Sequence, residues 1–198
     1  LNTTDLIKYI LENYKNVALS SSLGAEDQVL TDMIFKVNKN SRVFTLDTGR
    51  LHSETYKVLD ATNLKYGVKI EVFFLLFEEV ENLYKIQGVN GHFESIDKRK
   101  NCCNIRKIEP LKRALKGVDI WITGLRASQS ITRETMPIVE WDENFKVIKL
   151  NPLINWSEDD VWNYIKENKV PYNKLHDNGF PSIGCEPCTR AIKQGEDI

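Results

Sequence analysis

The sequence has few cysteines, no long apolar run and no excess of charge of either sign. No run approaches the ~20 apolar residues that a membrane-spanning helix requires, so we expect no membrane association. Lysine plus arginine number 27 against 28 for aspartate plus glutamate, so no overall positive field would attract a nucleic acid. No segment is repeated or of low complexity. These absences favour a soluble protein that acts on a small molecule.

The sequence also lacks the pattern of a signal peptide, since residues 1–5 are polar and acidic. This predicts a cytoplasmic protein, and in the cytoplasm disulfides are rare. At 198 residues with 41% hydrophobic residues, the chain can bury a core of its own. We therefore expect one domain over residues 1–198.

The four cysteines form two distant pairs. Cys102 and Cys103 are adjacent, whereas Cys185 and Cys188 form a Cys-x-x-Cys turn that aims two sulfurs at one point. Two disulfides would need an oxidising compartment. A zinc site with four cysteine ligands is chemically allowed but usually consists of two Cys-x-x-Cys knuckles, while an iron–sulfur cluster tolerates irregular spacing. The spacing favours a cluster over zinc and leaves both open.

Two cations follow the first cysteine pair. Arg106 and Lys107 lie where they would offset the negative charge of an all-thiolate cluster or hold an anion beside it. The alternative is that they form the solvated face of a helix, which is how most lysine and arginine side chains are used.

Strands and helices alternate along most of the chain, which predicts a mostly parallel, twisted α/β sheet covered by helices on both faces. Short apolar runs predict the strands, and apolar residues at helical spacing predict the helices. The predicted strands are 16–20, 41–46, 68–74 and 119–123, followed by a peripheral hairpin at 138–150. The predicted helices are 28–37, 52–66, 101–115 with a kink at Pro110, and one that starts at Ser157.

Polar loops follow three of these strands, at 20–27, 47–50 and 124–133. In a parallel sheet such loops share the edge at which ligands bind. The first loop is rich in serine and leads into a helix, so it either holds an anion at the helix terminus or only caps the helix. It lacks the Gly-Lys-Ser/Thr ending of a nucleotide-triphosphatase P-loop. The third loop carries Arg126 and Arg133, whose guanidinium groups suit phosphate or sulfate.

Several motifs together resemble assimilatory adenylyl-sulfate (APS) reductases, over nearly the whole chain. The motifs are Ser-Ser-Leu-Gly-Ala-Glu-Asp-Gln, Leu-Asp-Thr-Gly-Arg-Leu-His, Cys-Cys-Asn-Ile-Arg-Lys-Ile-Glu-Pro-Leu, Gly-Leu-Arg-Ala-Ser-Gln-Ser-Ile-Thr-Arg and Ile-Gly-Cys-Glu-Pro-Cys-Thr-Arg. The resemblance implies an adenine-nucleotide α-hydrolase-like fold of the ATP pyrophosphatase type. It also implies thioredoxin-dependent reduction of APS to sulfite and AMP through an S-sulfocysteine intermediate, in sulfate assimilation.

The resemblance further implies the site residues. Cys102, Cys103, Cys185 and Cys188 would bind a [4Fe-4S] cluster, and Lys107 would lie between cluster and substrate. The substrate would be held by Ser20, Ser21, Ser22, Gly24, Leu46, Asp47, Thr48, Gly49, Arg50, Arg106, Gly124, Arg126, Gln129 and Arg133.

The nucleophilic cysteine of that family lies in a C-terminal segment that this sequence, which ends at Ile198, does not contain. We expect the chain as written to bind substrate and cluster without turnover. Family members are often oligomeric, which favours a homo-oligomer. Three alternatives remain: a reductase of the 3′-phosphorylated substrate (PAPS), a metal-cluster sulfurtransferase that thiolates tRNA, and a regulatory binding module whose cysteines hold zinc.

Overall fold

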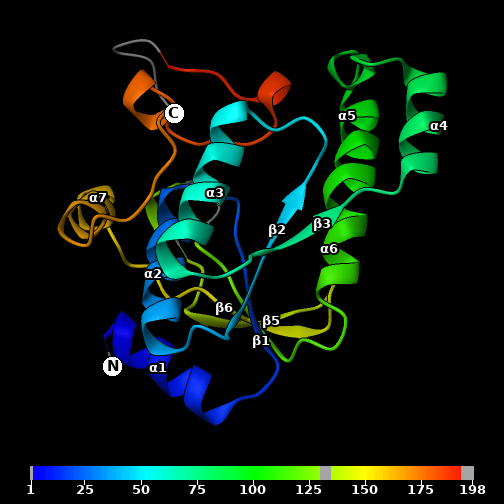
Figure 1. Ribbon diagram of the computed structural model, residues 1–198. Coiled ribbons are helices and arrows are strands. Elements are labelled where there is room, and N and C mark those ends of the chain that lie inside the picture. Colours follow the sequence, from blue (N-terminus) through cyan, green and yellow to red (C-terminus); the bar gives the residue numbers. More distant parts are fainter. Residues whose placement is uncertain (1, 130–134, 193–198) are drawn as a thin grey trace.

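The computed structural model describes residues 2–129 and 135–192, and at its centre the described residues form one six-stranded sheet (Figure 1). The strand order is β3-β2-β1-β4-β6-β5. All neighbours pair in parallel except β5 with β6, which form the predicted hairpin at one edge. The strands are β1 (Val17–Ser20), β2 (Arg42–Asp47), β3 (Glu71–Phe74), β4 (Ile120–Ile122), β5 (Val139–Asp142) and β6 (Val147–Leu150). The predicted fold class is confirmed.

Helices cover both faces of the sheet. One core cluster joins β1, β2 and β4 to α1 (Thr3–Asn13), α2 (Ala25–Val37), α3 (Ser53–Tyr66) and α7 (Glu158–Glu167). A second cluster joins the opposite face to α6 (Glu109–Ala114) through Leu111 and Ala114, which pack with Phe44 and Trp121. Apolar area buried on both faces stabilises a parallel sheet of this kind.

The helix that carries the first cysteine pair differs from the prediction. It begins at Ser95, whose side chain accepts a hydrogen bond from the Lys98 amide, so α5 spans Ile96–Cys103. A π-helical segment, η2 (Asn104–Ile108), then leads into α6. Pro110 is the second residue of α6, so the single helix predicted over residues 101–115 is interrupted by the π-helical segment just before the proline. Figure 1 shows α5 and α6 stacked end to end.

Two helices were not predicted: α1, which is capped by Asn2, and α4 (Phe77–Gln87). The boundaries of some predicted elements also differ in the structure. The third strand is shorter than predicted, because only residues 71–74 pair with β2. Helix α2 begins at Ala25 rather than at residue 28, so Glu26 and Asp27 belong to its first turn and not to the loop.

The strand order creates a switch point between β1 and β4. The chain leaves β1 to build β2 and β3 on one side, then returns to add β4 and β6 on the other. The loops after β1 and β4 therefore diverge and leave a crevice at the carboxyl ends of these strands. Ligands of open α/β sheets bind in such a crevice.

Candidate functional site

The loop after β1 is folded against the first turn of α2 by its own hydrogen bonds. The Ser22 amide and hydroxyl both donate to Asp27 Oδ2 at 2.6 Å. The Leu23 amide donates to Ser21 Oγ at 3.1 Å, and the Gly24 amide donates to Ser22 Oγ at 3.3 Å. Leu23 has a left-handed backbone with φ of 63°. The turn leaves Ser22 exposed at the amino end of α2, a position that favours an anion.

Asp27 lies between this loop and the end of β4. Burial raises the pKa of Asp27 to about 6, and the hydrogen bonds from Ser22 act in the opposite direction. Gly124, two residues after the end of β4, approaches so closely that a Cβ there would lie 2.2 Å from Asp27 Oδ1. Only glycine allows the β4 loop and the α2 terminus to meet in this way.

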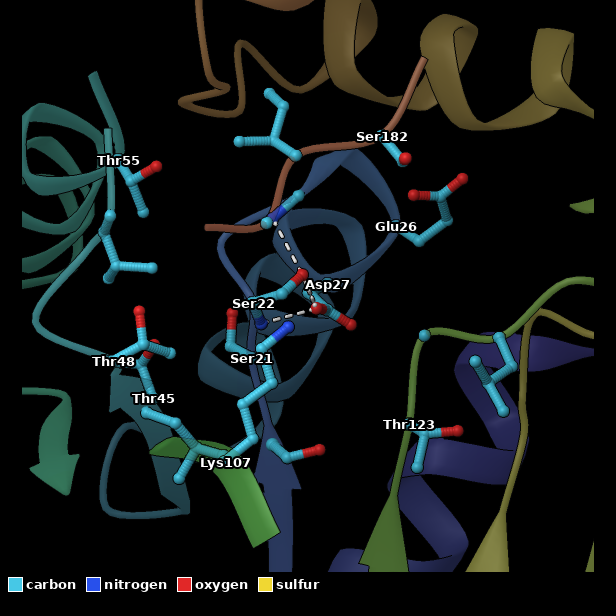
Figure 2. A pocket seen from close by; sticks show the side chains of 18 of the residues that line it. Ser21, Ser22, Glu26, Asp27, Thr45, Thr48, Thr55, Lys107, Thr123 and Ser182 are labelled. Carbon is cyan, nitrogen blue, oxygen red and sulfur yellow. Dashed lines mark hydrogen bonds between the residues drawn. The ribbon is translucent and has the colours of Figure 1, made fainter. Parts of the chain in front are cut away.

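A cavity of about 440 Å³ opens above the switch point (Figure 2). It is bounded by the serine loop, the ends of β2 and β4, the η2 segment and the chain just before Cys185. In Figure 2, Lys107 reaches into the cavity on the side of Ser21 and Ser22. The predicted substrate residues that line it, together with Lys107, are Ser20, Ser21, Ser22, Gly24, Leu46, Thr48, Gly124 and Gln129.

The four cysteines meet at a second cavity of about 190 Å³. All four are free thiols, although they come from α5 and from the distant C-terminal segment. The pKa of the Cys188 thiol is raised by burial and by the neighbouring cysteines, while Arg99 acts in the opposite direction. Among residues 2–129 and 135–192, no three histidine, cysteine or acidic side chains lie close enough to hold a single metal ion. The predicted convergence of both pairs on one place is observed, since all four cysteines line this cavity.

The two cavities share a wall. Lys107 and Cys185 line both of them. The Cys185 thiol donates to Thr48 Oγ1 at 3.2 Å, and Cys185 forms a β-bridge with Leu51 just before α3. The Glu186 amide donates to the Arg50 carbonyl at 2.8 Å, which fixes the second cysteine pair beside the β2 loop. A ligand in the larger cavity would therefore lie next to the cysteines.

The predicted arginines divide between different places. Arg50 and Arg106 line the cysteine cavity. Arg106 is buried, donates to the Thr48 carbonyl at 2.6 Å and to Tyr84 Oη at 3.0 Å, and its Nε has no hydrogen-bond partner among the described residues. Arg126 lines neither cavity, because it forms an ion pair with Glu26 at 2.7 Å.

Two other predicted residues, Asp47 and Gly49, line neither cavity. Asp47 Oδ1 accepts a hydrogen bond from the Gly49 amide at 2.8 Å, and this bond shapes the turn after β2. Arg133 lies outside the described residues.

The larger cavity also contains residues that the sequence did not single out. They include Trp121 and Lys149 on β4 and β6, Thr55 on α3, and Ser182 before the second cysteine pair. Ser182 could have been found from its position three residues before Cys185. Trp121 carries no such signal, since a tryptophan within an apolar strand is indistinguishable from a core residue.

The sheet order and the loop at the switch point define an α/β protein of the adenine-nucleotide α-hydrolase-like fold. The solved structure of FMN adenylyltransferase from Candida glabrata shares this fold, with a TM-score of 0.61 at 16% identity over 93% of this chain and 60% of that chain. A closer likeness is to phosphoadenylyl-sulfate (PAPS) reductase from Candida auris, with a TM-score of 0.82 at 30% identity over 96% of this chain and 91% of that chain.

Residues 16–191 match the phosphoadenosine phosphosulfate reductase domain family, and the chain belongs to this family. Two curated relatives are both named adenosine 5′-phosphosulfate reductase. The relative from Allochromatium vinosum is 45% identical over 98% of this chain and 76% of its own length. The relative from Neisseria meningitidis serogroup B is 46% identical over 96% of this chain and 77% of its own length. No helix among the described residues has the length and apolar character to cross a membrane.

Proposed function

We propose that this protein reduces adenylyl sulfate to sulfite and AMP, with thioredoxin as the reductant, in sulfate assimilation. The relatives named above act on this substrate by their names. The observation that carries the proposal is the shared wall: Lys107 and Cys185 line both the cavity at the switch point and the cavity of the four cysteines. An adenine nucleotide bound at the serine loop would direct its anionic end toward this wall.

We propose further that Cys102, Cys103, Cys185 and Cys188 hold a [4Fe-4S] cluster. Each iron of such a cluster takes one thiolate, so the four sulfurs spread more widely than around a single ion. This agrees with four free cysteines around one cavity and with the lack, among the described side chains, of a group fit for one metal ion. The cavity is also lined by Arg50, Arg99, Arg106 and Lys107, whose charge offsets that of the thiolates.

The residues of the chain then have distinct tasks. The serine loop and the amino end of α2 bind the phosphate. Lys107 neutralises the phosphosulfate and stabilises the charge that builds on AMP as the S–O bond breaks. A cluster held by the four cysteines would supply negative charge in the cavity that Lys107 also lines.

The reaction also needs a thiolate that attacks the sulfur of the substrate. The new S–S bond forms as the S–O bond to AMP breaks, and its electron pair leaves with AMP. The dithiol of thioredoxin then supplies two electrons that release sulfite and restore the thiolate. Since all four cysteines of this sequence line the second cavity, we assign none of them this role.

The test combines metal analysis with ligand binding on protein purified without oxygen. We expect about four iron and four sulfide per chain, and calorimetric binding of adenylyl sulfate that is tighter than that of its 3′-phosphorylated analogue. Stoichiometric zinc without iron would refute the cluster. Tighter binding of the 3′-phosphorylated compound would make it the substrate, and ATP binding with pyrophosphate release would point to an adenylating enzyme instead. Peptide mapping after incubation with adenylyl sulfate should find no sulfonate on the four cysteines.

A further inference from the structure

Trp121 belongs to the core cluster on one face of the sheet, and its indole N–H is bonded to a residue of the candidate site. Its indole Nε1–H donates to Ser20 Oγ at 2.8 Å, from β4 to the end of β1. The strand register pairs Ala18 with Trp121, so Ser20, two residues beyond Ala18, lies on the same face of the sheet. Both Trp121 and Ser20 line the large cavity. The bond therefore fixes a hydroxyl at the place where the nucleotide would bind.

The three serines of the loop differ in how their hydroxyls are used. The Ser22 hydroxyl donates to Asp27, so its hydrogen is already bound. The Ser20 hydroxyl accepts from Trp121, and because an indole nitrogen can only donate, the hydrogen of Ser20 remains available. The structure shows no hydrogen bond that the Ser20 hydroxyl donates to another described residue. Ser20 is thus prepared to donate, whereas Ser22 maintains the shape of the loop.

The surroundings of this pair favour an anionic acceptor. Ser20 directly precedes the loop that presents the amino end of α2, and Lys107 lines the same cavity. Lys149 lies over the Trp121 ring, with Nζ 5.7 Å from the ring centroid, and its charge is paired with Glu140 at 3.0 Å. These contacts hold the indole plane in place.

We propose that Trp121 is a positioning residue: it holds the Ser20 hydroxyl so that its hydrogen is donated to a phosphate oxygen of the bound nucleotide. The inference rests on the proposed function, because it takes an adenine nucleotide as the ligand. It adds Ser20 as a specific phosphate donor and gives Trp121 a role beyond core packing. A phosphate oxygen, rather than a ribose hydroxyl, is the acceptor.

The experiment is a double-mutant cycle measured by calorimetry with AMP and with adenosine, which lacks the phosphate. Trp121→Phe removes the N–H but keeps an aromatic ring, and Ser20→Ala removes the hydroxyl. We expect AMP affinity to fall about tenfold in Ser20→Ala and about threefold in Trp121→Phe, with no further loss in the double variant. Adenosine affinity should stay unchanged in all of them.

Trp156→Phe is the matched control. It removes an equivalent indole bond, from Trp156 Nε1 to Thr3 Oγ1 at 2.9 Å, at a site away from the cavity, and should leave AMP affinity unchanged. Unchanged AMP binding by Trp121→Phe would overturn the inference, as would an equal loss for adenosine or an additive loss in the double variant. If the wild type binds neither AMP nor adenylyl sulfate, the proposed function fails as well. If the wild type binds both ligands, but Trp121→Phe, Ser20→Ala and the double variant all bind AMP as tightly as the wild type, this inference alone fails.

Discussion

Gly124→Ala tests whether the contact between the β4 loop and α2 is as tight as the structure indicates. The added Cβ would stand 2.2 Å from Asp27 Oδ1 and 3.1 Å from Glu26 Cβ. A flexible surface carboxylate would simply rotate away. Asp27 cannot do so freely, because it is 9% exposed and accepts two hydrogen bonds from Ser22. The substitution must therefore break those bonds or push the first turn of α2 away from β4.

The two routes have similar costs in the free energy of unfolding. Losing hydrogen bonds to a buried carboxylate costs roughly 1.5–3 kcal/mol each, and an overpacked contact costs about 1–3 kcal/mol. We expect Gly124→Ala to lower the free energy of unfolding by roughly 2–4 kcal/mol. Because the serine loop is shaped by Asp27, AMP affinity should fall at least about tenfold. Urea denaturation and calorimetry measure the two effects on the same protein.

Gly67→Ala is the control for stability loss without loss of the site. Gly67 ends α3 with φ of 67° and has no atom within 4 Å of an added Cβ. An alanine at this position strains the backbone and should lower the free energy of unfolding by about 1 kcal/mol. Gly67 does not line the cavity of the serine loop, so AMP affinity should not change. A Gly124→Ala protein with wild-type stability and wild-type AMP affinity would show that Asp27 is not fixed by Ser22.

Three further predictions concern single side chains. Because burial raises the pKa of Asp27 from 3.8 to about 6, the native state takes up this proton first. The free energy of unfolding of the wild type, measured against Asp27→Asn, should therefore increase by roughly 3 kcal/mol as the pH falls from 7 to below 4; a pH-independent difference would contradict this. Asp32→Ala should lower the free energy of unfolding by about 3–5 kcal/mol in urea titrations, because Asp32 is fully buried and accepts from Tyr66 and Tyr164; a loss below about 1 kcal/mol would show that the network adds little. Lys107→Ala should weaken calorimetric binding of adenylyl sulfate and alter the visible spectrum of protein purified without oxygen, and if both stay the same Lys107 has no part in the site.

The strands of the sheet could be predicted because their signals are local. Apolar runs that end in polar loops gave β1, β2 and β4 to within one residue. Helix α4 was missed because its apolar side chains do not form one buried stripe: Phe77 and Ile86 are mostly exposed. Helix α1 was missed because its polar start, Asn2 to Asp5, is equally typical of a solvated terminus, although Asn2 in fact caps it.

The site was predictable to the extent that its chemistry depends on residue type. Four cysteines need a common partner, and the structure brings them to one cavity. The direction of each arginine was not predictable, because it depends on acceptors that are distant in sequence. Arg126 pairs with Glu26, 100 residues away, and Arg106 donates to the Thr48 carbonyl, 58 residues away. Sequence spacing holds no information on either contact.

The π-helical segment explains how one short stretch can serve both cavities. Cys102 and Cys103 end α5, and η2 follows at once. Successive residues of a helix point about 100° apart, so neighbouring side chains face different surroundings. Arg106 turns to the interior and Lys107 faces both the cysteines and the serine loop. A π segment changes the helical phase locally and is frequent at functional sites. The same stretch of backbone therefore presents two thiols to the cysteine cavity and Lys107 to the larger cavity. A shift of Cys102 and Cys103 would move Lys107 as well.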